Sequence, residues 1–187
     1  MFNFAERLGE RPDGSNPARH VERFPQRRRE RFLSADEMGR LGDALTSYSG
    51  SPYHVAAIKL LIFTGARLGE VLGLRWEWID FDRGDVRLPD SKTGAKTIHL
   101  PAPALEVLAA LPRIEGEPHI LGGRRSTTFI EAPWRRIRTA AGLPDVRLHD
   151  LRHSLSRPPP GGMRIWQATR WHCQLNGVEV SFSAPLG

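Results

Sequence analysis

The chain has 187 residues, of which 40% are hydrophobic, so it is long enough to form one domain with a buried core. Its longest apolar stretch, residues 55–63, is interrupted by Lys59 and is too short to cross a bilayer. The N-terminus carries no signal-peptide pattern, and the single cysteine, Cys173, excludes an internal disulfide. We therefore expect a cytoplasmic protein with no membrane partner.

The charge of the chain favours nucleic acid as its partner. The formal net charge is +6, the sequence pI is about 10.4, and only three of the 27 basic residues are lysines. Arginine presents a planar fork that can bind two phosphate oxygens at once, so an arginine-rich basic protein points to DNA or RNA. The alternative is that arginine usage reflects a GC-rich genome and the charge only maintains solubility.

The N-terminal half is predicted to be helical after a lead-in of residues 1–33. That lead-in has a turn-rich break at residues 13–17 and a charge run at residues 27–31, which is compatible with a DNA backbone or with simple solvation. Ser34 and Glu37 have the spacing of a capping box, which predicts a helix start. Two further helices are predicted by the apolar spacing, over residues 53–63 and, after the Thr64-Gly65 break, over residues 67–74.

The period then changes to that of strands. Short alternating segments separated by turns predict a three-stranded antiparallel sheet, with strands at residues 79–81, 86–88 and 98–100. Helices resume over residues 104–111, 133–141 and 148–154. Pro133 is placed in the first turn of its helix, and Gly142 is placed at a helix C-terminus.

The pattern stops near residue 155. The run Pro158-Pro159-Pro160-Gly161-Gly162 cannot continue a helix, and residues 163–187 show no sustained period. We therefore divide the chain into a lead-in (1–33), a folded domain (34–154) and an irregular, aberrant tail (155–187). The abrupt change after Ser154 suggests a change of reading frame in the gene.

Three groups of residues carry candidate chemistry. Arg67 and Glu70 are three residues apart on a predicted helix, where the carboxylate can fix the direction of the guanidinium. Lys92 lies in the second turn of the sheet, and His149 and Arg152 are again three apart on one helix face. Two arginines, a lysine and a histidine around one phosphate suit phosphoryl transfer, because fixed donors stabilise the charge on the non-bridging oxygens.

Each group also has a simpler interpretation. An Arg and Glu pair at this spacing is commonly a surface ion pair worth a few tenths of a kcal/mol. A lysine beside glycine in a turn is commonly solvated, and a histidine near a helix start is commonly a local hydrogen-bonding residue. The functional interpretation depends on the order and the context of the three groups together.

These three segments resemble motifs of one known family. Residues 64–70 (TGARLGE), followed by Leu74-Arg75-Trp76, resemble the first arginine box of the tyrosine recombinases, the phage-integrase family. Residues 90–94 (DSKTG) resemble the hairpin with that family's catalytic lysine, and residues 148–154 (LHDLRHS) resemble its His-x-x-Arg-His box. The resemblance covers about residues 17–154.

The resemblance implies an α+β fold, mostly α: an integrase-type catalytic domain with a small three-stranded antiparallel sheet, incomplete at the C-terminus. It implies site-specific recombination, in which double-stranded DNA is cut and rejoined through a phosphotyrosine link by recombinase protomers assembled as a tetramer on DNA. No metal, nucleotide or other cofactor is implied. Residues 1–33 would be the remnant of an N-terminal core-binding domain.

The resemblance also assigns roles to individual residues. Arg67 and Arg152 would clamp the scissile phosphate, and Lys92 would act as general acid toward the leaving 5′ oxygen. His149 would assist proton transfer. Glu70 and His153 would be supporting residues.

The chain departs from the family's pattern at the nucleophile. The only tyrosines, Tyr48 and Tyr53, precede Arg67 and fall in helices at the start of the domain, where they are expected to pack or to face solvent. No Leu-Gly precedes His172 and no tyrosine follows it, so the family's third basic group is not assigned to it. We therefore expect this chain to bind DNA without cutting it.

Two alternatives stay open on the sequence. One is a non-catalytic module that occupies DNA or pairs with an intact recombinase. The other is a zinc hydrolase, since His149, Asp150 and His153 resemble a His-Glu-x-x-His helix. Against zinc, aspartate is one methylene shorter than glutamate, and no third ligand has a matching context.

Overall fold

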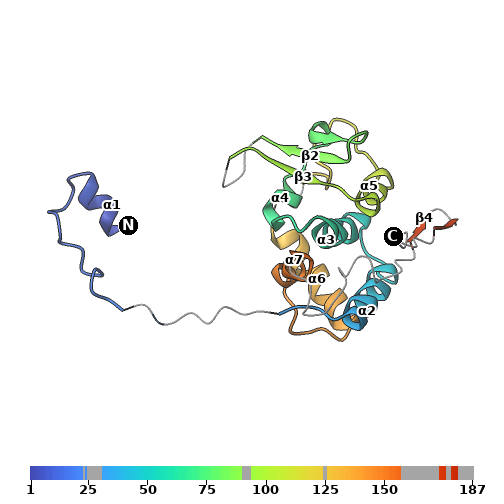
Figure 1. Cartoon of the computed structure of the whole chain (residues 1–187), viewed down its shortest axis with the longest axis horizontal. Helices are drawn as coiled ribbons and strands as arrows, with labels where there is room; N and C mark the ends of the chain where they lie inside the picture. Colours follow the sequence, from blue (N-terminus) through green and yellow to red (C-terminus); the bar gives the residue numbers. More distant parts are fainter. Residues whose placement is uncertain are drawn as a thin grey trace, which may run out of the picture.

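The structure is a computed structural model of the chain (Figure 1). It describes residues 1–22, 24, 31–89, 94–123 and 126–152, together with the backbone of residues 153–156, 173–175 and 178–180. The elements in chain order are α1 (Phe2–Arg7), α2 (Ala35–Thr46), α3 (Pro52–Thr64), α4 (Leu68–Leu72), the 3-10 turn η1 (Trp76–Trp78), β1 (Ile79–Asp80), β2 (Asp85–Leu88), β3 (Lys96–His99), α5 (Ala102–Ala109), α6 (Thr128–Ala140), α7 (Leu148–Ser156), β4 (Cys173–Leu175) and β5 (Val178–Val180).

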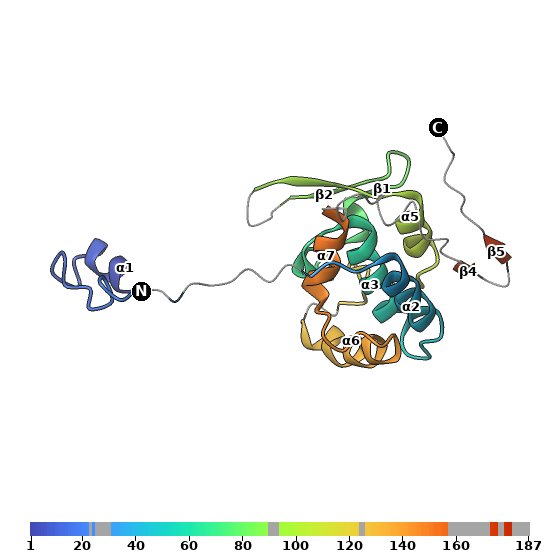
Figure 2. The same cartoon turned by 60° about the horizontal axis from the view of Figure 1, so that its bottom comes forward.

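Helix α3 is the centre of the helical body. It packs against α4, α5, α6 and α7, and its apolar residues are buried around its circumference, as expected for a helix that is hydrophobic on all sides. Figure 2 shows the sheet covering one side of this body, with α6 on the opposite side. The architecture is mostly helical with one small sheet, as the sequence predicts.

The three-stranded sheet is antiparallel in the order β1-β2-β3, which confirms the predicted topology. Val86 pairs with Ile98, and both side chains are buried. Arg87 and Thr97 form the neighbouring pair and are exposed. The period-2 alternation therefore turns one face of the sheet to the helices and the other to solvent.

Helix α6 begins five residues earlier than predicted. Pro133 lies inside the helix rather than in its first turn. The buried stripe of α6 starts at Ile130 and continues through Pro133, Trp134 and Ile137, so the apolar spacing extends across the proline. The prediction was wrong because the proline was taken as the helix start, although the packing begins before it.

The predicted glycine cap after α6 is confirmed. Gly142 has φ of +69°, its N–H donates to Thr139 O (3.0 Å), and the next N–H, of Leu143, donates to Arg138 O (2.8 Å). This is the Schellman arrangement, in which a left-handed residue lets the chain turn back onto the helix. Leu143 is 1% exposed and fixes the turn against the core.

Three arginines hold the loop between α6 and α7. Arg40 Nη1 donates to Ala141 O (2.9 Å), and Arg138 Nη1 donates to Val146 O (2.8 Å). Arg31 Nε lies 2.9 Å from Asp145 Oδ2. Much of the arginine content of this region therefore satisfies the backbone and carboxylates of the fold.

Arg31 also anchors the start of α2. The predicted capping box is present: the Glu37 N–H donates to Ser34 Oγ (3.2 Å), and the Ser34 N–H donates to Glu37 Oε2 (2.9 Å). The Arg31 guanidinium binds both oxygens of the same carboxylate, at 3.0 and 2.6 Å. Arg31 is therefore a structural residue, whereas residues 27–30 of the charge run lie outside the described residues.

Three short elements are described near the two ends of the chain: α1, β4 and β5. Helix α1 leaves the apolar residues Phe2, Phe4 and Leu8 exposed. Near the other end, β4 pairs antiparallel with β5, where the sequence analysis expects irregular chain. The rest of residues 157–187 lies outside the described residues.

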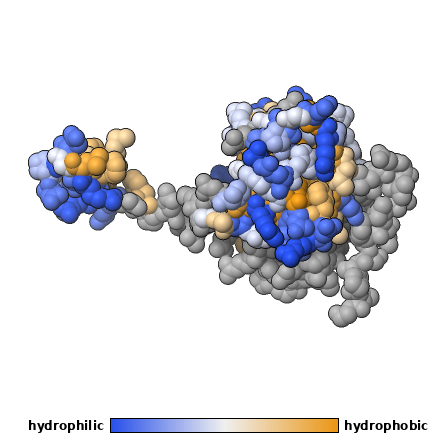
Figure 3. Space-filling view, turned by 90° about the horizontal axis from the view of Figure 1, so that it is seen from above, coloured by the Kyte–Doolittle hydropathy of each residue, from blue (hydrophilic) through white to orange (hydrophobic). Residues whose placement is uncertain are grey.

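The surface of the body is largely polar on the sheet side. Figure 3 shows this face, which is mainly hydrophilic around a smaller hydrophobic area. Of the large apolar residues in the described body, Phe81 and Ile114 are exposed. No helix among the residues with described placement is long and apolar enough to span a membrane.

The Arg31 contacts predict a pH-dependent loss of stability. Arg31→Met should lower the free energy of unfolding by about 1–2 kcal/mol at pH 7, since it removes charge-assisted hydrogen bonds at a site only 24% exposed. The Arg31 hydrogen bond is the first cause that holds the Glu37 pKa below its ordinary 4.5. Because the pKa of Glu37 is lower in the folded state than in the unfolded state, its carboxylate stabilises the fold at a pH above the unfolded-state pKa. This contribution is lost as the pH falls through the folded-state pKa.

Urea unfolding at pH 7 and at pH 3 measures this effect. The difference between wild type and R31M should shrink at pH 3. Arg83→Met is the control, because Arg83 is 69% exposed and 3.9 Å from its acidic partner. An equal loss for both variants at pH 7 would contradict the structural role of Arg31.

Candidate phosphate-binding site

The turn between α3 and α4 fixes where Arg67 begins its helix. Gly65 closes α3 in the left-handed region (φ of +61°), and its N–H donates to Leu61 O (3.1 Å). Thr64 Oγ1 donates to Leu60 O (2.6 Å) and accepts from the Ala66 N–H (3.2 Å). Gly65 and Ala66 therefore form a two-residue turn between α3 and Arg67, which is the N-cap of α4.

Glu70 holds Arg67 by both backbone and side chain. The Arg67 N–H donates to Glu70 Oε2 (2.9 Å), and Arg67 Nη1 donates to Glu70 Oε1 (2.8 Å). The Glu70 side chain is only 9% exposed, whereas that of Arg67 is 41% exposed. The carboxylate is thus buried beneath a guanidinium that keeps part of its surface open to solvent.

A second cation binds the same carboxylate. Lys96 Nζ lies 3.1 Å from Glu70 Oε2. Burial by itself raises the pKa of Glu70, but the hydrogen bonds from the Arg67 backbone, the Lys96 ammonium and the Arg67 side chain outweigh it and hold that pKa below its ordinary value. Glu70 is therefore ionised at neutral pH and forms a triad with two positive partners.

Lys96 is a residue that the sequence analysis missed. It pairs with Leu88 across the sheet and shares the inward face of β3 with buried Ile98. A lysine at an inward strand position requires a counter-ion, and Glu70 provides it from α4. Strand alternation counted back from Ile98 is the signal that could have identified Lys96.

The second arginine box lies on α7. The Asp150 carboxylate is buried, with the residue 4% exposed, and accepts a hydrogen bond from the Arg147 N–H (2.9 Å) at the start of the helix. This capping contact anchors the first turn of α7. It leaves His149 exposed and Arg152 half-buried, three residues apart on the helix.

The structure places the predicted residues as follows. Arg67 and Glu70 are in direct contact. His149 and Arg152 are on α7, which packs against α3 as α4 does, and Figure 1 shows α4 and α7 on the same side of α3. Lys92 lies outside the described residues, as does the side chain of His153.

The two tyrosines belong to the opposite end of α3. The Tyr53 hydroxyl donates to Pro112 O (3.0 Å), and the Tyr48 hydroxyl lies 3.3 Å from His54 Nδ1. Both rings pack against the core. Tyr53 lies eleven residues before Thr64, which corresponds to about 16 Å along the helix axis, so the length of α3 separates it from the turn that carries Arg67.

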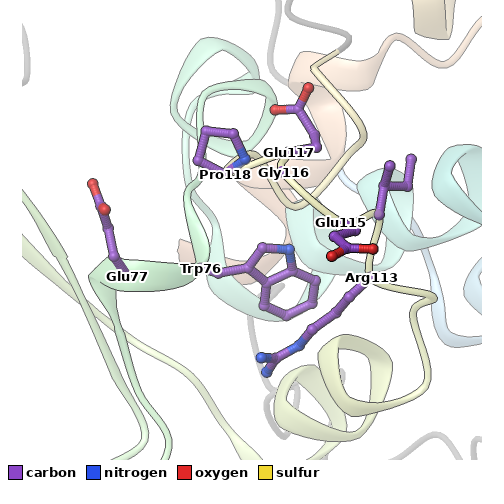
Figure 4. Close-up of a pocket in the computed structure, with 8 residues that line it drawn as sticks. Trp76, Glu77, Arg113, Glu115, Gly116, Glu117 and Pro118 are labelled. Carbon is purple, nitrogen blue, oxygen red and sulfur yellow. The ribbon is translucent and has the colours of Figure 1, made fainter.

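A separate open pocket of about 550 Å³ lies where the chain after α4 meets the loop after α5. Figure 4 shows Trp76 and Arg113 facing each other in it, and the guanidinium lies 4.4 Å from the ring centroid. On its rim, Glu117 Oε1 lies 2.8 Å from His119 Nδ1. Trp76 of the first motif therefore supports a cation–π contact here.

The acidic residue of the possible metal-binding motif on α7 has a structural role, and the side chain of His153 lies outside the described residues. That acidic residue, Asp150, caps the helix, and no group of three or more His, Cys, Asp or Glu side chains suited to a metal is found within the described part of the chain. A His-Glu-x-x-His site needs its acid facing the metal-bound water rather than the backbone of its own helix start.

Substitution of Asp150 separates capping from metal binding. Asp150→Ala should lower the free energy of unfolding by about 1–2 kcal/mol, because it removes the buried carboxylate that accepts a hydrogen bond from the Arg147 N–H. Asp150→Asn keeps an acceptor oxygen and should lose less than half as much. Thermal unfolding measures both, and elemental analysis of wild type, loaded with zinc and dialysed, should show far less than one zinc per chain. Stoichiometric zinc in wild type that is lost in a His149→Ala variant would contradict this interpretation.

Comparison with known proteins identifies the family. The profile of the phage integrase family matches residues 31–158, more than half of the chain. The shufflon-specific DNA recombinase of Escherichia coli is 31% identical over 127 residues, which are 67% of this chain and 32% of that protein. The prophage integrase IntF of Escherichia coli is 31% identical over 112 residues, 56% of this chain and 24% of that protein.

Solved structures agree with this match. A lambda integrase dimer bound to a COC' core site superposes with a TM-score of 0.58 and 25% identity, over 81% of this chain and 57% of that chain. The XerA recombinase superposes with a TM-score of 0.57 and 23% identity, over 72% of this chain and 50% of that chain. The chain spans about a third or less of the two curated relatives named above. Its fold is that of integrase catalytic domains, and the chain belongs to the phage integrase family of site-specific recombinases.

Proposed function

We propose that this chain binds double-stranded DNA through one backbone phosphate, held between Arg67 at the N-cap of α4 and Arg152 of α7. The proposal rests on the environment of Arg67. Buried Glu70 fixes the direction of its guanidinium, while 41% of the Arg67 side chain is accessible to solvent. A guanidinium that is fixed on one side and open on the other can bind an incoming phosphate with little loss of side-chain entropy.

The remaining predicted residues complete this proposal. Lys92 would donate a proton to the leaving 5′ oxygen, and His149, exposed on the same helix as Arg152, would assist proton transfer. His153 would support them. The net charge of +6 supports binding to DNA, because every phosphate neutralised by a cation releases counterions.

We also propose that the chain does not cut DNA by itself. The contacts of Tyr48 and Tyr53 support this, since both hydroxyls have partners at the far end of α3 from Arg67. Without a tyrosine at the phosphate, the arginines hold DNA but no phosphotyrosine link forms. The chain then acts by occupying DNA, or by pairing there with recombinase protomers that have the nucleophile.

Gel-shift titration of a 30-base-pair duplex at increasing salt tests DNA binding. Because binding neutralises phosphate charge, the affinity should fall between 50 and 200 mM salt, by about 3.5-fold for each phosphate contacted. Arg67→Met and Arg152→Met should each weaken binding about 20-fold or more and reduce the salt slope by about 1. Arg83→Met, which removes an exposed charge beside β1 at the other end of the sheet from Lys96, should leave binding within about twofold.

Absence of binding at low salt would refute the proposal. Equal effects of R83M and R67M would also refute it, because binding would then depend on overall charge rather than on the site.

A suicide duplex with a nick beside each candidate cleavage position tests the lack of cleavage. We expect salt-sensitive binding with no covalent adduct on denaturing gels. An adduct that survives denaturation, and that maps by mass spectrometry to a residue of this chain, would show a working nucleophile and would contradict the proposal.

A further inference from the structure

Lys96 of β3 contacts Glu70 of α4, the helix whose N-cap is Arg67. Its Nζ lies 3.1 Å from Glu70 Oε2, while Arg67 Nη1 lies 2.8 Å from the other oxygen of the same carboxylate. Glu70 is 9% exposed, so these two cations replace most of the water that a free carboxylate would bind. The contact joins residues that are 26 positions apart in the sequence.

The charges of this triad explain what Lys96 contributes. Arg67 and Lys96 carry one positive charge each and Glu70 one negative charge, so the triad has a net charge of +1. Without Lys96, Glu70 would neutralise Arg67 completely and compete with any phosphate for its donors. With Lys96 present, the carboxylate still orients Arg67 through its backbone and side chain, but its charge is shared between two partners.

The position of Lys96 in the sheet directs its side chain toward α4. The pairing of Leu88 with Lys96 is the last of the β2–β3 ladder, and Leu88 is buried. Lys96 is on the inward face with Ile98, so its side chain is directed at α4 by the strand itself. The Lys96 side chain is 32% exposed and is paired with the buried Glu70 carboxylate, unlike a freely solvated surface lysine.

We infer that Lys96 is a positioning residue, which acts through Glu70 to keep the Arg67 guanidinium oriented and electrostatically available for a phosphate. This inference rests on the proposed function for its ligand, but the positioning itself can be measured without DNA. Lys96 does not contact the phosphate in this scheme, and that distinguishes it from Lys92.

The test without DNA uses nuclear magnetic resonance of the whole chain. In Lys96→Met, the heteronuclear NOE of the Arg67 Nε–Hε group should fall, and the Glu70 carboxyl should titrate at a higher pH than in wild type. Lys96→Arg should restore both values, because it keeps a cationic donor at the same place. Unchanged Arg67 dynamics and an unchanged Glu70 titration in K96M would overturn the inference.

The test with DNA is a double-mutant cycle on duplex affinity at 50 mM salt. K96M should weaken binding about tenfold in the wild-type background, as expected for loss of one charge-assisted contact, and K96R should recover it to within about threefold. In the E70Q background, where no carboxylate competes for Arg67, K96M should cost less than about threefold. An undiminished tenfold loss in E70Q would show a direct phosphate contact and would overturn positioning.

Arg87→Met is the matched control. Arg87 is exposed on the outer face of the same sheet, so its removal takes away one charge without touching the triad. Its effect should be the same in the wild-type and E70Q backgrounds. Thermal unfolding of each variant monitors folding, and Lys96→Gln, which has a neutral polar side chain, replaces K96M if the latter is unfolded.

The two proposals fail differently. If wild type does not bind DNA but K96M still loosens Arg67, the proposed function is wrong and the positioning role is supported. If wild type binds DNA but K96M changes neither Arg67 dynamics nor affinity, the positioning role is wrong and the proposed function is unaffected.

Discussion

The buried carboxylate of Glu70 is the interaction on which the candidate site depends. An ionised group that is 9% exposed is costly unless it is paired and hydrogen-bonded. In this chain the partners are the backbone N–H that starts α4, the Arg67 guanidinium and the Lys96 ammonium. The Glu70 carboxylate therefore binds the start of α4, the candidate phosphate-binding residue Arg67 and Lys96 of β3. A change to any of these three affects the other two.

The arginines of this chain serve two distinct purposes. Arg31, Arg40 and Arg138 bind carboxylates or backbone carbonyls and fix the loop that leads into α7. Arg67 is anchored in a similar way but keeps much of its surface accessible. A high arginine content is thus only an indirect indication of DNA binding, because part of it stabilises the fold, and the accessible arginines are the ones that bear on function.

Local signals in the sequence predicted much of the fold. The Ser34–Glu37 capping box and the glycine cap at Gly142 depend on residues within a few positions of each other, and both are present. The Arg67–Glu70 pair is also local and was predicted from its i, i+3 spacing. The Lys96–Glu70 contact and the Arg113–Trp76 cation–π contact join distant segments, so no local pattern predicts these pairs. Strand alternation predicts only that Lys96 faces inward. The start of α6 was misplaced for another reason: packing of Ile130 overrides the preference of Pro133 for a first turn.

In the proposed complex Arg67 and Arg152 bind one phosphate together, although 85 positions separate them in the sequence. A crystal structure of the chain bound to duplex DNA tests this most directly. Both guanidinium groups should donate to non-bridging oxygens of the same phosphodiester, with Glu70 bound to Arg67 and Lys96 and neither tyrosine within reach of the phosphorus. Guanidinium groups that contact two different phosphates, or DNA bound on another face of the domain, would contradict it.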